Sequence, residues 1–181
     1  YTGSVYTTDS KAVVENVFIK PRDVYMAGGP GPNAGCSGNG LPDGPYYFQV
    51  TDPSGETLLS TDPLASRAVV VSDGVISAAG EHSTRNGPCG SKIVQLIPFD
   101  PTPNSSGEYK VWLIPAADYV SGGPNHGFPS SASKTDNFKI RGGGKPTEQG
   151  LITGTVFYDI DEDGVFDPSV PDEVPIPGWR V

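Results

Sequence analysis

The sequence predicts an all-β fold, and three observations carry that prediction. Glycine and proline are frequent, 24 and 19 of the 181 residues, and they interrupt nearly every stretch long enough for three turns of helix. The runs between these interruptions are rich in β-branched and aromatic residues, which fit a pleated, half-buried surface. Turn dipeptides of the Asp-Pro and Asp-Gly kind separate the runs. Many short strands divided by such turns are typical of a β-sandwich.

Seven segments are predicted strands on this basis. In chain order they are 12–19, 45–50, 67–71, 92–97, 108–114, 137–141 and 151–158. The first of them also fits a helix, through the spacing of Val13, Val14, Val17 and Phe18. Its β-branched content and the Pro21 that follows favour a strand.

The segment 108–114 is predicted to be a central strand. Val111 and Leu113 share one of its faces, and Trp112 and Ile114 share the other. Because both faces are apolar, we expect both to be covered.

Three neighbouring aromatic residues mark the segment 45–50. We expect Tyr46 and Phe48 to point into the core with Val50, and Tyr47 to point outward. The alternative is that exposed tyrosine and tryptophan side chains form a platform on which sugars stack.

The composition divides the chain into regions. Two long loops, 27–44 and 121–133, are rich in Gly, Pro and Ser, and loops of that length are functional or mobile. The stretch 142–150 has almost nothing to bury and reads as a linker. We therefore expect an Ig-like or prealbumin-like β-sandwich over 1–141 and the truncated N-terminal part of a second β-sandwich module, which binds calcium, over 151–181.

The formal net charge of −9 is unevenly distributed. Residues 151–181 hold seven of the acidic residues and one basic residue, Arg180. The acidic balance argues against a nucleic-acid partner, which needs Lys and Arg to replace phosphate counterions. No apolar run approaches the roughly 18 residues of a membrane span, so we expect no span in this segment.

Two cysteines, Cys36 and Cys89, lie in polar, glycine-rich surroundings. Free cysteines are usually buried among apolar residues, so this setting favours a disulfide between them. Two unrelated reduced thiols are the alternative. A disulfide indicates an oxidising compartment, and we expect an extracellular or cell-surface location.

A calcium loop is the sharpest chemical signal. Asp159, Asp161 and Asp163 occupy positions 1, 3 and 5 of an EF-hand-type loop, Gly164 follows at position 6, and Asp167 stands at position 9. The backbone carbonyl of Val165 would serve at position 7.

The closing position of this loop departs from the EF-hand pattern. Position 12 holds Val170 where a bidentate Glu is expected, so Asp172 or Glu173 would have to close the site. The alternative is a solvated acidic turn without an ion. The loop also follows a predicted strand instead of a helix.

Residues 154–181 resemble the opening of a serine–aspartate-repeat B-type module, which is related to collagen-adhesin B-type repeats. The resemblance rests on Gly154-Thr-Val-Phe-Tyr-Asp-Ile-Asp-Glu-Asp-Gly-Val-Phe-Asp167 and on Pro175-Ile-Pro-Gly-Trp-Arg-Val181. Such modules are prealbumin-like β-sandwiches of bacterial surface proteins and serve as stalks stiffened by Ca²⁺. The resemblance implies that the aspartates of the loop are the ligands. Residues 1–150 are assigned to no family.

The two histidines, His82 and His126, both lie in polar stretches and are expected at the surface. Neither has the spacing of a zinc site, and no Gly-x-Ser-x-Gly elbow is present.

We therefore expect a non-catalytic, monomeric, extracellular structural or adhesive module of a multidomain protein, rigidified by Ca²⁺. The alternative is a module that binds an extracellular protein or glycan through its long loops or aromatic residues.

Overall fold

The computed structural model describes residues 1–141, 157–160, 164–167, 169, 171 and 174–176. The chain divides into two units, Tyr1–Thr147 and Glu148–Val181. The predicted linker 142–150 lies outside the described residues, as does most of the predicted strand 151–158.

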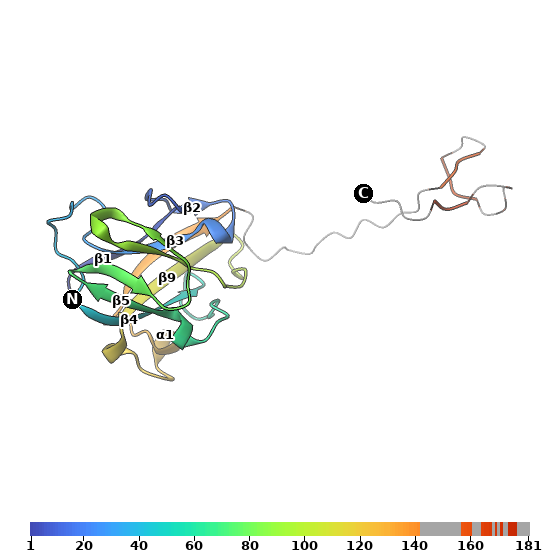
Figure 1. The fold of residues 1–181 in the computed structure, drawn as a ribbon. Helices are drawn as coiled ribbons and strands as arrows, with labels where there is room; N and C mark the ends of the chain where they lie inside the picture. Colours follow the sequence, from blue (N-terminus) through green and yellow to red (C-terminus); the bar gives the residue numbers. More distant parts are fainter. Residues whose placement is uncertain (142–156, 161–163, 168, 170, 172–173, 177–181) are drawn as a thin grey trace. The chain divides into compact units, whose positions relative to one another are not determined.

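The described part of the first unit is built from strands arranged in two sheets (Figure 1). In chain order they are β1 Ser4–Thr8, β2 Val17–Phe18, β3 Tyr25–Gly29, β4 Gly44–Thr51, β5 Ala68–Ser72, β6 Val75–Ala79, β7 Thr84–Asn86, β8 Lys92–Gln95, β9 Glu108–Pro115 and β10 Lys134–Ile140. The helical elements are short: 3₁₀ turns at Pro21–Asp23, Leu64–Arg67, Pro88–Gly90 and Ala116–Asp118, and the single turn α1 at Pro124–Gly127. The predicted all-β class is confirmed.

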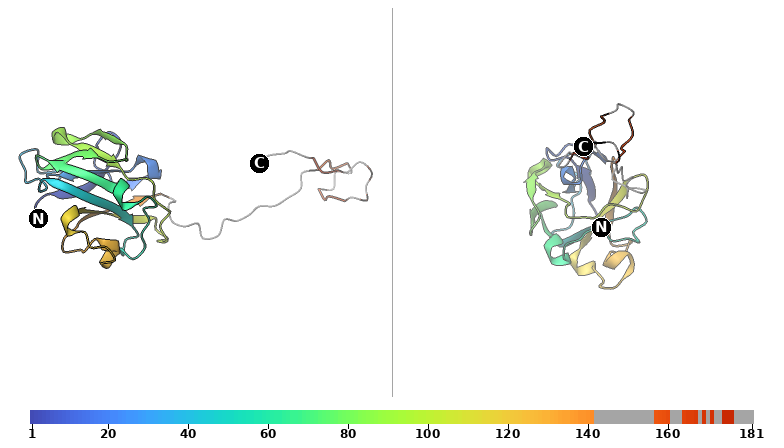
Figure 2. Two further views of the ribbon diagram at one scale, coloured as in Figure 1. Left: turned by 60° about the horizontal axis from the view of Figure 1, so that its bottom comes forward. Right: turned by 90° about the vertical axis from the view of Figure 1, so that its right-hand side faces the viewer.

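The two sheets form the layers of a sandwich (Figure 2). The four-stranded sheet has the order β1-β3-β8-β7, and the six-stranded sheet has the order β2-β10-β9-β4-β5-β6. Neighbouring strands are antiparallel except for β2, which runs parallel to β10. The segment 108–114 falls within β9, between β4 and β10, so the predicted central strand is confirmed.

The hairpin between β5 and β6 follows directly from its turn residues. Ser72 pairs with Val75, which leaves Asp73 and Gly74 as a two-residue loop. Both have positive φ, 54° and 79°. This is the backbone of a type I′ turn, whose twist matches that of the flanking strands, and Asp-Gly is among its preferred sequences.

The main core lies between the sheets and is formed by alternate residues of the long strands. Tyr46, Phe48 and Val50 of β4 are at most 1% exposed and pack in one cluster with Val111 and Leu113 of β9. The inward orientation predicted for the aromatic residues of β4 is confirmed.

A second apolar cluster covers the outer face of the six-stranded sheet. Trp112, Ile114 and Phe128 are buried there, with Tyr47 and Tyr119 partly buried against them. Phe128 belongs to the connection 116–133 between β9 and β10, which therefore folds back over the sheet that it leaves. The prediction that both faces of β9 are covered is confirmed.

A tyrosine at the start of β9 fixes the connection that leads into it. The hydroxyl of Tyr109 accepts a hydrogen bond from the backbone amide of Thr102 at 3.1 Å, and both residues are buried. The ring of Tyr109 stacks on Phe138 of β10 with centroids 5.1 Å apart. One side chain thus joins the β8–β9 connection to the core.

The predicted strand 12–19 is largely wrong. Only Val17–Phe18 is a strand, because the Asp9 side chain accepts bonds from the amides of Lys11 and Val13 and forms a turn there. Ala12 sits at φ 64° within that turn. Four strands, β1, β3, β6 and β7, were not predicted.

Candidate functional site

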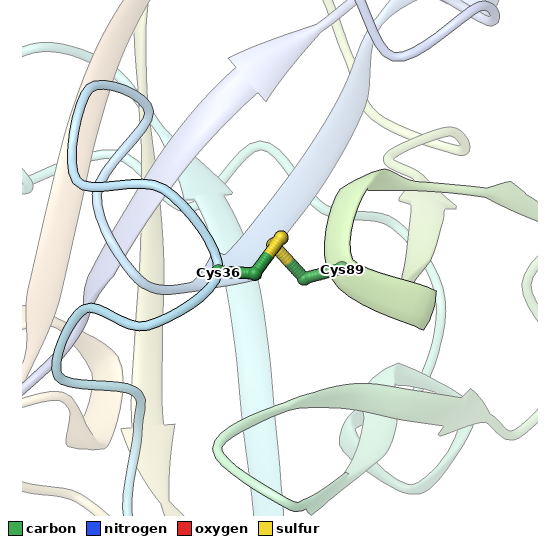
Figure 3. The surroundings of a disulfide bond; sticks show 2 residues. All are labelled: Cys36 and Cys89. Atoms are coloured by element: carbon green, nitrogen blue, oxygen red, sulfur yellow. A yellow bond between two sulfur atoms is a disulfide. The ribbon is translucent and has the colours of Figure 1, made fainter.

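The predicted disulfide between Cys36 and Cys89 is present (Figure 3). The sulfurs of Cys36 and Cys89 are 2.05 Å apart and the Cα atoms 5.3 Å apart. Cys36 lies in the long connection 30–43 between β3 and β4, and Cys89 lies in the 3₁₀ turn before β8. The bond therefore joins a loop to a turn at the surface, where both residues are exposed. A disulfide is compatible with an extracellular location.

The acidic loop of the second unit is closed at its base by a short stretch of β-structure. Phe157 and Pro175 form an antiparallel bridge, and the Tyr158 amide donates to the Val174 carbonyl at 3.2 Å. The rings of Phe157 and Phe166 lie 5.3 Å apart across the loop. These contacts bring the two ends of the loop together and hold them.

Position 1 of the predicted calcium loop is bonded to position 6. Oδ2 of Asp159 accepts a hydrogen bond from the Gly164 amide at 2.9 Å. Gly164 has φ +79°, a conformation in which a side chain is strained. The bond brings the amide at position 6 of the predicted loop to the carboxylate at position 1.

Asp167, at position 9, caps the residues that follow it. Its Oδ1 accepts bonds from the Ser169 hydroxyl at 2.6 Å and from the Ser169 amide at 2.8 Å. These bonds lower the pKa of Asp167 and favour its carboxylate. An ionised carboxylate is the form that binds Ca²⁺.

The remaining predicted ligands are only partly visible. Asp161, Asp163 and Glu173 lie outside the described residues. Val165, whose carbonyl was assigned position 7, is 61% exposed. Among the residues that the structure describes, no group of three or more acidic, His or Cys side chains converges.

A buried charged cluster in the first unit was not predicted. The expectation that His82 lies at the surface is wrong, because its side chain is 3% exposed. Its Nε2 is 2.9 Å from Oδ2 of Asp62, its Nδ1 is 2.7 Å from the Gln95 carbonyl, and its ring packs on Phe48 with centroids 4.8 Å apart. Asp62 precedes β5 and Gln95 ends β8, so the imidazole links the two sheets.

Arg67 completes this cluster. Its Nε is 3.7 Å from Oδ1 of Asp62, and its Nη1 donates to the Phe48 carbonyl at 3.3 Å. Burial lowers the pKa of Arg67, and the neighbouring carboxylate of Asp62 partly offsets that effect. Both ring nitrogens of His82 face acceptors, so neither is available to activate a nucleophile in this arrangement. The cluster is a structural link, and its members were too far apart in sequence to be recognised together.

His126 is exposed as predicted, and it lies in α1 within the connection 116–133. Its Nε2 lies 3.0 Å from the Glu56 carbonyl, and the neighbouring Asn125 carbonyl accepts a bond from Gln49 Nε2 at 2.8 Å. These two bonds hold α1 against β4 and against the start of the β4–β5 connection.

The aromatic residues considered as a sugar platform pack against other side chains of the protein. Tyr47 contacts Tyr119 with ring centroids 5.7 Å apart, and Tyr119 contacts Phe128 at 5.8 Å. Trp112 is 3% exposed and donates from Nε1 to the Thr51 hydroxyl at 2.9 Å. In this structure the rings of Tyr47, Trp112 and Tyr119 belong to the cluster under the connection 116–133.

Two surface hollows belong to the first unit. One runs beside the disulfide and is lined by Tyr6, Val75 and the prolines Pro30, Pro32 and Pro88. The other is a groove beside β2, lined by Val17 and Ile19 together with charged residues.

Comparison with known proteins gives no relative: no family model, no curated protein and no solved structure matches the chain. Among the described residues, no helix is long and apolar enough to cross a membrane.

Proposed function

We propose that the protein is a non-catalytic, extracellular structural or adhesive module in which an Ig-like sandwich is followed by a calcium-binding loop. Strand order supports the first part. The order β1-β3-β8-β7 matches the four-stranded sheet of a variable-type Ig domain, and β10-β9-β4-β5-β6 matches its five-stranded partner. The strand β2 is an addition on the outer side of β10.

The tyrosine at the start of β9 supports the same assignment. Ig-like domains carry a tyrosine at this corner whose hydroxyl bonds back to the backbone upstream, as Tyr109 does with Thr102. Val111, two residues further on, occupies the position of the second cysteine in antibody domains. The disulfide of this protein instead ties a loop to a turn.

The bond between Asp159 Oδ2 and the Gly164 amide is the observation that carries the calcium proposal. It joins positions 1 and 6 of the predicted loop, and in the sequence the next acidic residues, Asp161 and Asp163, follow at alternate positions. Clustered carboxylates repel each other, and a divalent cation removes that repulsion. Calcium would thereby stiffen the start of a prealbumin-like second module, as the resemblance of 154–181 implies.

Calorimetric titration of the whole chain with Ca²⁺ tests this proposal. We expect about one bound ion, loss of binding in Asp159→Ala and unchanged binding in Asp118→Ala, which removes an exposed carboxylate of the first unit. Chelation should also lower the melting temperature of the second unit. Absence of binding heat, with superimposable melting curves in calcium and in chelator, would contradict the proposal.

Protein binding is the second candidate function, and one observation favours it over glycan binding. The aromatic rings of the alternative sugar-stacking platform are packed under the connection 116–133. The edge of β2, in contrast, is open and apolar.

A further inference from the structure

The strand β2 has one paired side and one open side. In its parallel ladder with β10, the Lys139 amide donates to the Asn16 carbonyl and the Arg141 amide donates to the Phe18 carbonyl. Alternate residues of a strand face opposite neighbours, so the backbone groups of Val17 and Ile19 point away from β10. Within the described residues, these groups have no recorded hydrogen-bond partner.

The open side of β2 is also apolar. Phe18 is 3% exposed and anchors the strand in the core, whereas Val17 is 45% and Ile19 is 70% exposed. Val13 and Val14, just before the strand, are exposed as well. Proteins usually protect an edge strand with charges, prolines or a covering element, because an open edge recruits another strand. The side chains of β2 itself provide no such protection.

The groove along this edge carries an excess of negative charge. Its rim is formed by the carboxylates of Asp9, Glu15 and Asp23 against the single guanidinium of Arg141. The amides of Lys11 and Val13 hold Oδ1 of Asp9 in place at the rim. A second copy of this chain would bring the same carboxylates to the same place, so like charges oppose self-pairing. An extended segment with basic side chains has complementary charge.

We propose that this groove binds an extended, basic peptide segment of a partner protein, which adds as a strand to the open edge of β2. The Val17 and Ile19 backbone groups would supply the hydrogen bonds, as in other cases of β-strand addition. Alternate apolar side chains of the peptide would cover Val17 and Ile19, and its Lys or Arg side chains would meet the acidic rim. This inference rests on the second candidate function, protein binding, and requires no calcium.

A peptide of alternating lysine and valine, seven residues long and blocked at both ends, tests the proposal on the whole chain in the presence of chelator. We expect the NMR chemical shifts of the Val17 and Ile19 amides to change saturably with peptide concentration, and hydrogen exchange at these amides to slow. A glutamate–valine peptide of the same length should bind at least tenfold more weakly. Working in chelator separates this result from that of the calcium titration.

Two variants and one matched control locate the site. Ile19→Pro removes an outward amide while leaving the ladder bonds of Phe18 intact, and it should weaken binding at least tenfold. Ile19→Lys places at the groove a charge of the same sign as the lysines of the peptide, and it should also weaken binding at least tenfold, which keeps the test available if the proline variant does not fold. Val120→Lys, at a valine that is 50% exposed in another loop, should leave binding unchanged.

Several outcomes would overturn the proposal. One is that the peptide does not bind at millimolar concentration, and another is that the acidic peptide binds as tightly as the basic one. The others are that the Ile19→Lys variant binds as tightly as the wild type, and that the amide signals that shift on peptide addition belong to a surface away from β2. A concentration-dependent dimer that is lost in Ile19→Lys would show that a second copy occupies the edge instead.

Discussion

The two long connections of the sandwich are held in place by different means. Of residues 30–43, Leu41 is the only one that is buried, and this loop is tied down through Cys36. The connection 116–133 has no cysteine, and it is held by Phe128, which is fully buried on the outer face of the six-stranded sheet. A loop that offers little apolar surface needs a covalent link, whereas a loop with one large buried ring can rely on packing.

The largest effect is expected from removing the covalent link. The disulfide joins residues 53 apart in sequence, so the loop-entropy model predicts that Cys36→Ser with Cys89→Ser costs about 4 kcal/mol. Chemical denaturation measures the loss in the free energy of unfolding. Hydrogen exchange in the variant should be accelerated more in the connection 30–43 than in the connection 116–133. Ser37→Ala, a neighbouring exposed substitution, should be neutral. Equal loosening of both connections would show that they are not held independently.

Truncation of the buried ring tests the packed connection. Phe128→Ala should cost about 3 kcal/mol, through lost burial and the cavity that remains. Phe128→Leu keeps most of the volume and should cost about 1 kcal/mol. In a Trp179→Phe background, a red shift of Trp112 emission would report exposure of the outer face. An unshifted spectrum would mean that Trp112 stays covered when the ring is removed.

The contrast between the two connections was only half visible in the sequence. The glycine-rich settings of Cys36 and Cys89 predicted their pairing, because free thiols avoid such surroundings. The connection 121–133 looked like a plain glycine- and serine-rich loop. Its single Phe128 gives no periodic signal, and only the fold shows that the loop reaches the apolar face of Trp112.

The same limit applies to the strands and the site. Alternation identified β4 and β9, because their apolar residues recur with period two. β3, which ends in Gly28 and Gly29, is buried along its whole length and shows no such alternation. The cluster of Asp62, Arg67 and His82 joins residues of two different connections, β4–β5 and β6–β7, which no local pattern relates. The acidic loop, in contrast, is local, so its residues could be named from spacing alone.

A smaller effect is expected at the glycine beside the buried ring. Gly127 has φ +94°, and a Cβ at this position would meet the ring of Tyr119. Gly127→Ala should therefore cost about 2 kcal/mol, from backbone strain together with the clash. Gly122 also has positive φ, 74°, but has open space around it, so Gly122→Ala should cost about 1 kcal/mol from strain alone. Thermal unfolding compares the two, and equal losses would rule out the clash with Tyr119.

The smallest effect concerns the turn beneath α1. Asp52 accepts bonds from the Ser54 hydroxyl at 2.5 Å and from the Thr57 amide at 2.9 Å. Burial tends to raise the pKa of Asp52, but these hydrogen bonds outweigh burial and the pKa is lowered. Because the folded-state pKa lies below the unfolded one, the carboxylate stabilises the fold at neutral pH. That stability is lost as the pH falls from the ordinary pKa of Asp, about 4, through the lowered pKa of Asp52 in the folded protein.

Asp52→Asn tests whether the carboxylate of Asp52 stabilises this turn, which contacts the connection 116–133. At neutral pH it should cost about 1 kcal/mol, because a neutral amide replaces a charged acceptor. The difference from the wild type should shrink as the pH falls through the titration of Asp52, which carboxyl NMR follows directly. Ser54→Ala removes one donor and should raise the pKa of Asp52 toward its ordinary value. If the cost of Asp52→Asn stays constant down to strongly acidic pH, the carboxylate is not what orders the turn.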